Sequence, residues 1–175
     1  TRLDMTENHN FALSQATGEY VCLIGDDDSV SHELYDIALW AKNKNIKLIT
    51  PKVSASYNWP DFITQVYGDK HCTRLYLPNK VGGIEIKDSK SALLEALDRS
   101  CQGTDGLPKL YHGLVSTSLL TELYEKAGAY VHGSSPDMSA AIGLAFISKD
   151  FYEVDYPLTI PGASGGSNTG RSALN

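Results

Sequence analysis

The sequence predicts an α/β fold in which a mostly parallel sheet is flanked by helices, and three observations support this class. Residues 21–24 (VCLI) are apolar without alternation, as in a strand that is buried on both faces of a sheet. Residues 34–41 carry apolar side chains at the spacing of one helix face. Residues 47–50 form a second short apolar run, which Pro51 ends. Strand, helix and strand in this order are typical of a βαβ unit with a right-handed crossover.

The first element is predicted to be a helix over residues 6–16, which a Thr-Gly pair ends. Thr6 can cap its N-terminus, and Glu7 suits the positive end of the helix dipole. Its predicted apolar side consists of Phe11, Ala12 and Ala16. The chain then enters a strand at residues 20–24, which we expect to lie in the middle of the sheet with neighbours on both sides, one of them residues 47–50.

The second helix is predicted to begin after Ser29 or Ser31 and to run to about Asn43. Its apolar stripe consists of Leu34, Ile37, Ala38 and Ala41. Further strands are predicted over residues 52–57, 72–77 and 82–87. Here the sheet gains antiparallel members or the chain makes an excursion from it.

The second half of the chain predicts three helices, two strands and a tail. The predicted helices cover residues 89–98, the segment from Ser116 or Thr117 to Gly128, and the segment that Ser135 and Pro136 begin. The predicted strands cover residues 110–115 and 151–156. Residues 157–175 are rich in Gly and Ser and are expected to be mobile unless a ligand orders them. We therefore expect one domain over residues 1–156 and a flexible tail over residues 157–175.

Composition and charge bound the partners and the compartment. The 175 residues carry a net charge of −6 with a pI of about 5.3, which argues against a nucleic-acid partner recognised through a basic surface. No apolar run approaches the roughly 20 residues that span a bilayer, and no signal peptide is visible. Cys22, Cys72 and Cys101 have no metal-type spacing, and Cys22 falls in the predicted core strand. We therefore expect a reduced, cytoplasmic protein.

Three consecutive carboxylates, Asp26, Asp27 and Asp28, follow the central strand and Gly25. Like charges side by side repel, and a cation among them removes that repulsion. If the backbone stays extended, Asp26 and Asp28 point to the same side, and such oxygen ligands suit Mg²⁺ or Mn²⁺ together with substrate phosphates. The carboxyl end of a strand is also where open α/β sheets place ligands. An acidic, solvated turn that caps the next helix is the alternative, and the pattern alone leaves both open.

Two segments resemble the family 2 glycosyltransferases, enzymes of the GT-A fold. Residues 8–28 (NHNFALSQATGEYVCLIGDDD) share that family's Asn-led helix, its A-x-GEY turn, a buried strand and an acidic DxD motif. Residues 134–145 (SSPDMSAAIGLA) resemble the segment that carries the family's catalytic aspartate. The match is good over residues 4–50 and moderate over residues 109–148.

The resemblance implies an inverting glycosyltransferase that moves a sugar from a nucleotide-diphosphate donor to an acceptor hydroxyl. The acceptor would be a glycan or a lipid-linked sugar, in bacterial surface polysaccharide synthesis at the inner face of the membrane. By the same resemblance Asp28 and Asp26 would bind Mn²⁺ or Mg²⁺, while Asp26, Asp27 and Asn8 would contact the donor. Asp137 would take the proton of the acceptor hydroxyl as general base. An Asp in the first turn of a helix is also favourable through the dipole alone, which is the structural alternative for Asp137.

Two histidines are weaker candidates for the site. His112 follows a predicted buried strand, and His132 precedes the SSPD segment, so either could reach a site at the edge of the sheet. A lone histidine is more often structural. Members of the resembled family often offer a histidine late in the chain as a further metal ligand, but no histidine follows His132 here. The third metal ligand is therefore not assigned.

Two other functions fit parts of the sequence. Residues 23–30 (LIGDDDSV) also fit the signature of haloacid-dehalogenase-like phosphatases, with Asp26 as nucleophile and Asp28 as acid/base. That resemblance would require a downstream lysine and a second acidic pair, and we find no such pair after Asp28. A non-catalytic packing or acceptor-binding module is the third hypothesis.

The resemblance also predicts an N-terminally truncated sheet. Members of the family begin with a strand, a helix and a strand that hold the nucleotide base, whereas only residues 1–5 precede the first predicted helix here. We therefore expect half of the donor site to lie upstream, and this chain alone to bind nucleotide sugar weakly or not at all and to be inactive. We also expect homo-oligomers that form through the exposed sheet edge beside residues 20–24.

Overall fold

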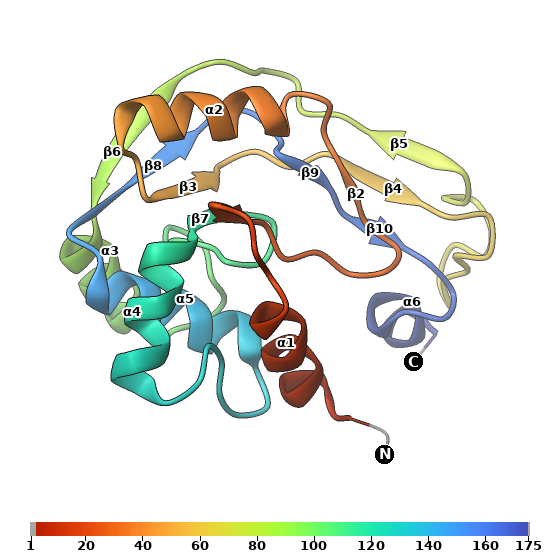
Figure 1. Ribbon diagram of the computed structural model, residues 1–175. Helices are drawn as coiled ribbons and strands as arrows, with labels where there is room; N and C mark the ends of the chain where they lie inside the picture. Colours follow the sequence, from red (N-terminus) through yellow and green to blue (C-terminus); the bar gives the residue numbers. More distant parts are fainter. Residues whose placement is uncertain (1–2, 175) are drawn as a thin grey trace.

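A computed structural model describes residues 3–174, and its main body is a sheet between two layers of helices (Figure 1). Within these residues the sheet has five strands in the order β1-β7-β3-β8-β6. They are β1 (Tyr20–Val21), β7 (Leu114–Ser116), β3 (Leu48–Pro51), β8 (Asp150–Val154) and β6 (Ile84–Asp88). The helices are α1 (Met5–Ser14), α2 (Leu34–Lys44), α3 (Ser89–Asp98), α4 (Thr117–Ala127) and α5 (Pro136–Ile147). Helix α2 covers one face of the sheet, and the other four lie on the opposite side.

The sheet is mixed, so the α/β class is confirmed but a mostly parallel arrangement is not. In the described part of the chain only β3 and β8 pair in parallel within this sheet, whereas β1–β7, β3–β7 and β6–β8 are antiparallel. The prediction that residues 47–50 lie beside the central strand is wrong, because β7 inserts between β1 and β3. The strand expected in the middle of the sheet is instead its edge strand β1. A single parallel bridge from Leu23 to Tyr111 continues this edge.

Two apolar clusters hold the layers together. Successive residues of a strand point to opposite faces, so the three inner strands β7, β3 and β8 each contribute to both clusters. The side chains that face α3, α4 and α5 include Leu48, Val115 and Phe151. Those that face α2 include Ile49, Leu114 and Val154. All six are at most 5% exposed, and burial of such a side chain contributes roughly 1.5–3 kcal/mol.

Helix α1 begins at Met5, one residue earlier than predicted. Asp4 is its N-cap rather than Thr6: Asp4 Oδ1 accepts from Glu7 N at 2.7 Å, and Glu7 Oε2 accepts from Asp4 N at 2.9 Å. These two hydrogen bonds form a capping box. The predicted apolar side of the helix is wrong as well, because Phe11 is 60% exposed while Leu13 is the buried residue.

An asparagine explains how α1 is oriented. The Asn10 side chain donates to Val131 O at 2.9 Å and accepts from Tyr130 N at 2.9 Å, so it joins α1 to the loop before α5. These hydrogen bonds fix the rotation of the helix, which turns Leu13 inward. The spacing of apolar residues contains no information about such hydrogen bonds. The buried face of α1 was therefore predicted wrongly.

The other predicted helices are confirmed, and of these only α2 begins later than predicted. The apolar stripe of α2 packs against the sheet as predicted, but Glu33 occupies its N-cap and makes no side-chain capping bond. Ser116 caps α4, and Gly128 ends it with a φ of 80°. Helix α5 starts at Pro136 after Ser135, whose side chain makes no capping bond. The strand predicted over residues 110–115 is shorter in the structure. It consists of β7, Leu114–Ser116, because the chain turns at residues 110–113.

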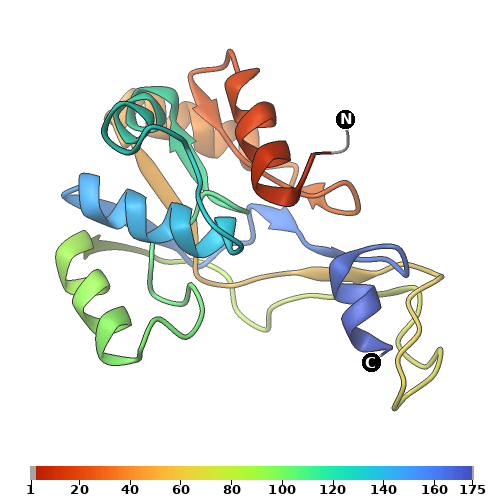
Figure 2. The ribbon, with the colours of Figure 1, turned by 90° about the horizontal axis from the view of Figure 1, so that it is seen from below.

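A second, smaller sheet extends away from α3, α4 and α5 (Figure 2). Its strands follow the order β10-β4-β5, with β4 at Ser56–Asn58, β5 at Arg74–Tyr76 and β10 at Gly162–Ala163. A further pair joins β2 (Ser29–Val30) to β9 (Thr159–Ile160) in antiparallel orientation. Strands β9 and β10 and helix α6 (Asn168–Ala173) give regular structure to residues 159–173, which lie in the segment that its Gly- and Ser-rich composition predicts to be mobile. No helix within residues 3–174 is long and apolar enough to cross a membrane.

Candidate functional site

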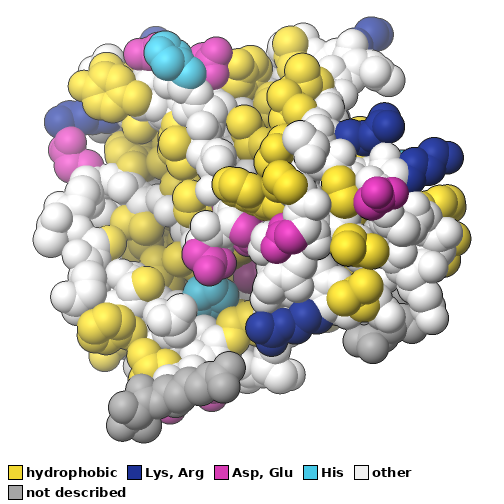
Figure 3. All heavy atoms as spheres, turned by 90° about the vertical axis from the view of Figure 1, so that its right-hand side faces the viewer, with side chains coloured by type: hydrophobic (Ala, Val, Ile, Leu, Met, Phe, Trp, Pro, Cys, Tyr) yellow, Lys and Arg dark blue, Asp and Glu magenta, His cyan; other side chains and the backbone are white. Residues whose placement is uncertain are grey.

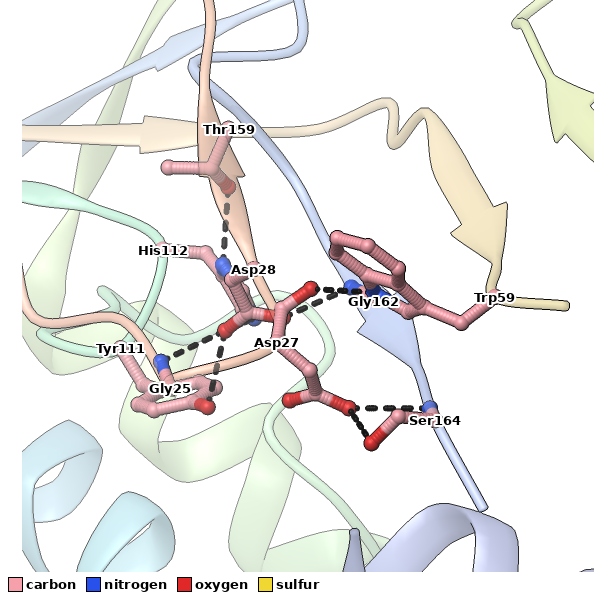
Figure 4. A network of polar contacts seen from close by, with 9 residues as sticks. All are labelled: Gly25, Asp27, Asp28, Trp59, Tyr111, His112, Thr159, Gly162 and Ser164. Carbon is pink, nitrogen blue, oxygen red and sulfur yellow. Dashed lines mark hydrogen bonds and ion pairs between the residues drawn. The ribbon is translucent and has the colours of Figure 1, made fainter. Parts of the chain in front are cut away.

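The acidic segment after β1 is a turn rather than an extended strand end. Asp28 N donates to Gly25 O at 3.4 Å, and the Asp28 carboxylate folds back so that its Oδ2 accepts from Gly25 N at 2.6 Å. The expected arrangement, in which Asp26 and Asp28 share one side of an extended backbone, is therefore not found. The carboxylates of Asp27 and Asp28 point to different surroundings (Figure 4).

The Asp28 carboxylate is buried and surrounded by donors. Its side chain is 4% exposed. Besides Gly25 N, Oδ2 accepts from the Tyr111 hydroxyl at 3.0 Å, and Oδ1 accepts from Gly162 N at 2.7 Å. His112 Nε2 lies 3.7 Å from Oδ2. The carboxylate thus joins the acidic turn, the loop before β7 and strand β10, which are far apart in the sequence.

The other two carboxylates differ from Asp28. Asp27 Oδ2 accepts from Ser164 N and Ser164 Oγ, both at 3.0 Å, and the backbone oxygen of Asp27 accepts from Trp59 Nε1 at 2.9 Å. Asp26 is exposed and lines a cavity of about 780 Å³. Of the three, Asp26 is therefore the carboxylate that is most accessible to a ligand.

The loop 110–113 places two aromatic side chains beside Asp28. Burial and the negative charge of Asp28 raise the pKa of the Tyr111 hydroxyl, which therefore stays protonated and donates to Asp28. His112 has a φ of 65°, and its Nδ1 lies 2.8 Å from Thr159 Oγ1. Burial lowers the pKa of His112, although the charges of Asp28 and Asp137 act in the opposite direction. Neutral His112 can accept from Thr159 through Nδ1 while Nε2–H points at Asp28.

The predicted site residues come together around the larger cavity. It is lined by Asn8, Asp26, Asp27, Asp28, His112 and Asp137, with other residues from α1, the acidic turn and the segment 161–168. Figure 3 shows acidic side chains and a histidine gathered around a hollow near the middle of one face. His132 is exposed and does not line this cavity. The segments that resemble the glycosyltransferase family, separated by more than a hundred residues, thus share one cavity.

A second cavity of about 340 Å³ adjoins the first. Both are lined by Tyr111, His112, Asp137 and Pro161. Polar side chains in the second cavity include Lys52, Ser54, Thr104, Asp105 and Lys109. Asp137 lies in the first turn of α5, is exposed, and is the only one of the predicted acidic residues that lines both cavities. Asp137 therefore lies at the border of the two cavities, within reach of molecules bound in either of them.

The side chains around the larger cavity show which of them could hold the predicted Mn²⁺ or Mg²⁺ ion. Within residues 3–174 no three His, Cys, Asp or Glu side chains are grouped so that they alone could hold a metal ion. The hydrogen bonds of Asp28 occupy both of its oxygens, so its carboxylate is not directed at a ligand. Asp26 keeps an accessible carboxylate, and Mg²⁺ commonly uses one or two carboxylates plus substrate phosphates. The donor set therefore fits a cation held at Asp26 largely by a substrate, and not one enclosed by protein.

Sequence reasoning missed three parts of this site. Tyr111 was part of an apolar run, and nothing in its spacing marked the hydroxyl that contacts Asp28. Gly162 and Ser164 lie in the segment expected to be mobile, yet both donate backbone amides to the acidic turn. The short sequence GASGGS, residues 162–167, was the available signal, because small residues permit close approach of two backbones.

Gly162→Ala is expected to lower the free energy of unfolding by about 1–3 kcal/mol, as is typical of overpacking. A Cβ at Gly162 would lie 1.7 Å from the backbone oxygen of Asp27, so β10 would have to move away from the acidic turn. Gly166 lines the same cavity and has no atom within 4 Å of a Cβ, which makes Gly166→Ala the matched control. Urea unfolding compares the two; equal midpoints would contradict the close approach.

The pH dependence of stability tests the surroundings of His112. Its pKa in the folded protein is lowered from 6.5, so the folded state binds fewer protons than the unfolded chain. The contribution of His112 to the unfolding free energy is present above pH 6.5 and is lost as the pH falls through the pKa of His112 in the folded protein. Asn tolerates positive φ, so His112→Asn is expected to show a smaller loss of unfolding free energy between pH 8 and pH 5. Urea unfolding at several pH values gives the unfolding free energy of both proteins as a function of pH. Equal losses of unfolding free energy between pH 8 and pH 5 would contradict the assignment.

No family model matches the chain, and no curated protein matches it. Function is therefore inferred from the resemblance of the two segments and from the geometry of the two cavities.

Proposed function

We propose that the chain forms part of an inverting glycosyltransferase that moves a sugar from a nucleotide-diphosphate donor to an acceptor hydroxyl. The observation that carries this proposal is the position of Asp137, which lines both adjoining cavities. Direct displacement needs a donor on one side of the reacting carbon and an acceptor with a base on the other. Two cavities that meet at one accessible carboxylate provide that arrangement.

The larger cavity is assigned to the donor. It contains Asn8 and the acidic turn, where Asp26 is accessible and the second oxygen of Asp27 has no partner among the described hydrogen bonds. The smaller cavity is assigned to the acceptor, a glycan or a lipid-linked sugar. Its Ser, Thr, Lys and Asp side chains are of the kinds that hydrogen-bond sugar hydroxyls.

Asp137 acts as the general base in this proposal. Its carboxylate accepts the proton of the acceptor hydroxyl while that oxygen forms the new bond to the anomeric carbon. The bond from that carbon to the diphosphate breaks on the opposite side and its electron pair leaves with the diphosphate, so the configuration inverts. Protonated Tyr111 and neutral His112 keep the wall between the cavities fixed through Asp28 and Thr159.

A divalent cation is assigned to the donor side at Asp26. Mn²⁺ or Mg²⁺ bound there with the donor would neutralise charge on the leaving diphosphate. Asp28, which the sequence resemblance makes a metal ligand, is proposed instead to hold the acidic turn in shape, because its oxygens accept from Gly25, Tyr111 and Gly162. Asp27 holds the segment that contains Ser164.

Binding of nucleoside diphosphates tests the proposal in the longest form of the protein that its gene encodes. Calorimetry with UDP, GDP, CDP and dTDP in the presence of Mn²⁺ should identify at least one ligand. Asp26→Asn is expected to weaken that binding at least tenfold. Asp36→Asn, which changes an exposed carboxylate in the first turn of α2, should leave it unchanged. No binding of any of the four, or equal binding by both variants, would refute the donor site.

The same hydrogen bonds weigh against the phosphatase hypothesis. A haloacid-dehalogenase-like mechanism needs Asp28 as a mobile acid/base, whereas this carboxylate is 4% exposed and accepts from three donors. Release of phosphate from phosphomonoesters, lost in Asp26→Asn, would favour the phosphatase. A protein that binds sugar acceptors but no nucleotide would favour the non-catalytic module.

A further inference from the structure

Strand β6 is a long, uncovered edge of the main sheet. It pairs with β8 over residues 84–88, and no other strand of the described chain lies on its outer side (Figure 1). All of its residues except Lys87 are exposed. The opposite edge, β1, is only two residues long and half-buried. An exposed edge presents unpaired backbone donors and acceptors, so β6 is the edge at which pairing with another strand is expected.

The hydrogen-bond pattern shows which groups of β6 face outward. Ser89 N donates to Lys149 O at 3.0 Å, which continues the register that pairs Asp88 with Asp150. Backbone groups of an antiparallel strand point alternately toward and away from the neighbour. Glu85 and Lys87, two and four residues before Ser89, therefore direct their amides at β8. Ile84, Ile86 and Asp88 direct theirs at solvent.

The sequence of β6 is self-complementary in one antiparallel register. When two copies pair about Ile86, this residue lies opposite itself, and Ile84 lies opposite Asp88 of the second copy. These are the residues whose amides face outward, so each such pair can exchange two hydrogen bonds. Glu85 then lies directly opposite Lys87 of the second copy, on both sides of the two-fold axis. A register centred on Glu85 or on Lys87 would instead place like charges opposite each other.

Both faces of the strand suit this pairing. Ile84 and Ile86 are 58% and 59% exposed and share one face, where pairing would bring the two Ile86 side chains together. Glu85 and Lys87 share the other face, where Lys87 Nζ lies 2.8 Å from Glu85 Oε1. Lys52 also pairs with Glu85, and Glu153 pairs with Lys87. Closed two-fold pairing of this kind is the commonest form of homo-oligomer.

We propose that β6 is a dimerisation edge at which two copies of this chain pair antiparallel about Ile86, so that the five strands of each form one continuous sheet. The charge pair between Glu85 and Lys87 of the second copy sets the register. This edge lies at the opposite end of the sheet from β1, beside which self-association was expected from the sequence. The proposal does not depend on the proposed function.

Charge reversal tests the register in the 175-residue chain. Light scattering should show a dimer, and Glu85→Lys and Lys87→Glu should each raise the dissociation constant at least tenfold, because each places like charges opposite each other. A mixture of the two single variants should form heterodimers, and the double variant E85K/K87E should dimerise again. Lys90→Glu, at an exposed position outside the strand, is the matched control and should leave the dimer unchanged. Circular dichroism checks that each variant is folded.

A cysteine at the centre gives a second measurement that does not depend on charge. Ile86→Cys should form a covalent dimer on mild oxidation, because residues that face each other across a hydrogen-bonded pair are about 5.5 Å apart at Cα. Ile84→Cys, which lies opposite Asp88, should not, and the unchanged chain with Cys22, Cys72 and Cys101 gives the background. A monomer at all concentrations, a dimer indifferent to both charge reversals, or equal cross-linking of the two cysteine variants would overturn the proposal. So would pairing of β6 with a strand of a different protein while the chain itself stays monomeric.

Discussion

Asp137→Asn is expected to lower the rate of sugar transfer by about 10²–10⁴, the usual effect of removing a general base. Asn keeps the size of the side chain and its place in the first turn of α5, but it cannot accept a proton at neutral pH. Affinity for the donor should change little, because Asp137 lies at the border of the donor cavity and not in the acidic turn. Steady-state kinetics in the full-length protein should therefore show a loss in kcat with a similar donor KM.

The matched control for this prediction is Asp105→Asn. Asp105 is exposed and lines the smaller cavity as Asp137 does, but not the larger one. Its side chain can contact an acceptor without reaching the border of the two cavities. If Asp137→Asn kept the turnover of Asp105→Asn, Asp137 would be reduced to a residue that stabilises a helix terminus.

Asp28→Asn is expected to lower the free energy of unfolding by about 3 kcal/mol in the absence of any metal. The buried carboxylate accepts from Gly25 N, Gly162 N and the Tyr111 hydroxyl. An amide group replaces one acceptor by a donor, and a buried donor left without a partner costs about 1–3 kcal/mol beside the lost charge-assisted bonds. Urea unfolding in the presence of a chelator measures the effect.

The neighbouring carboxylate supplies the control. Asp26 is exposed, so Asp26→Asn should change the unfolding free energy by about 0.5 kcal/mol or less. A carboxylate that served only as a metal ligand would show the reverse behaviour, with no stability lost when metal is absent. If the two variants had equal unfolding free energies in the presence of a chelator, Asp28 would be a metal ligand, as the sequence resemblance implies.

Much of the fold follows from local patterns in the sequence. The stripe from Leu34 to Ala41 predicts α2, and its burial against Ile49 and Leu114 follows from the spacing. Ser116 and Gly128 mark the two ends of α4, because a hydroxyl can cap the first turn and glycine adopts the left-handed conformation that ends it. These signals are local, and the structure confirms them.

The order of the strands could not be predicted in this way. Residues 114–116 are as apolar as residues 47–50, and no local property says that the former insert beside β1. Periodicity was also a poor guide for α1, where the hydrogen bonds of Asn10 to a loop 120 residues later determine the buried face. Long-range pairing of this kind is decided by tertiary contacts.

The predicted site residues lie together, but their arrangement was not predicted, and neither were the contributions of Tyr111, Gly162 and Ser164. Asn8, the three aspartates and Asp137 line one cavity, as expected of residues that act together. No local pattern indicated that backbone amides would donate to the Asp28 carboxylate, because those amides belong to Gly25 and to Gly162, which lies in a segment with no apolar pattern. Gly- and Ser-rich composition predicts mobility when the partner that would order the segment is unknown.

The configuration of the newly formed glycosidic bond distinguishes direct displacement by one base from every other mechanism at this site. The account places a single base, Asp137, on the acceptor side and therefore predicts direct displacement with inversion. The coupling constant of the anomeric proton, measured by NMR on the first product formed by the full-length protein, reports this configuration. An α-linked donor should give a β-linked product, and Asp137→Asn should suppress its formation. A product with retained configuration, or cleavage of the donor without any glycosidic product, would contradict the account.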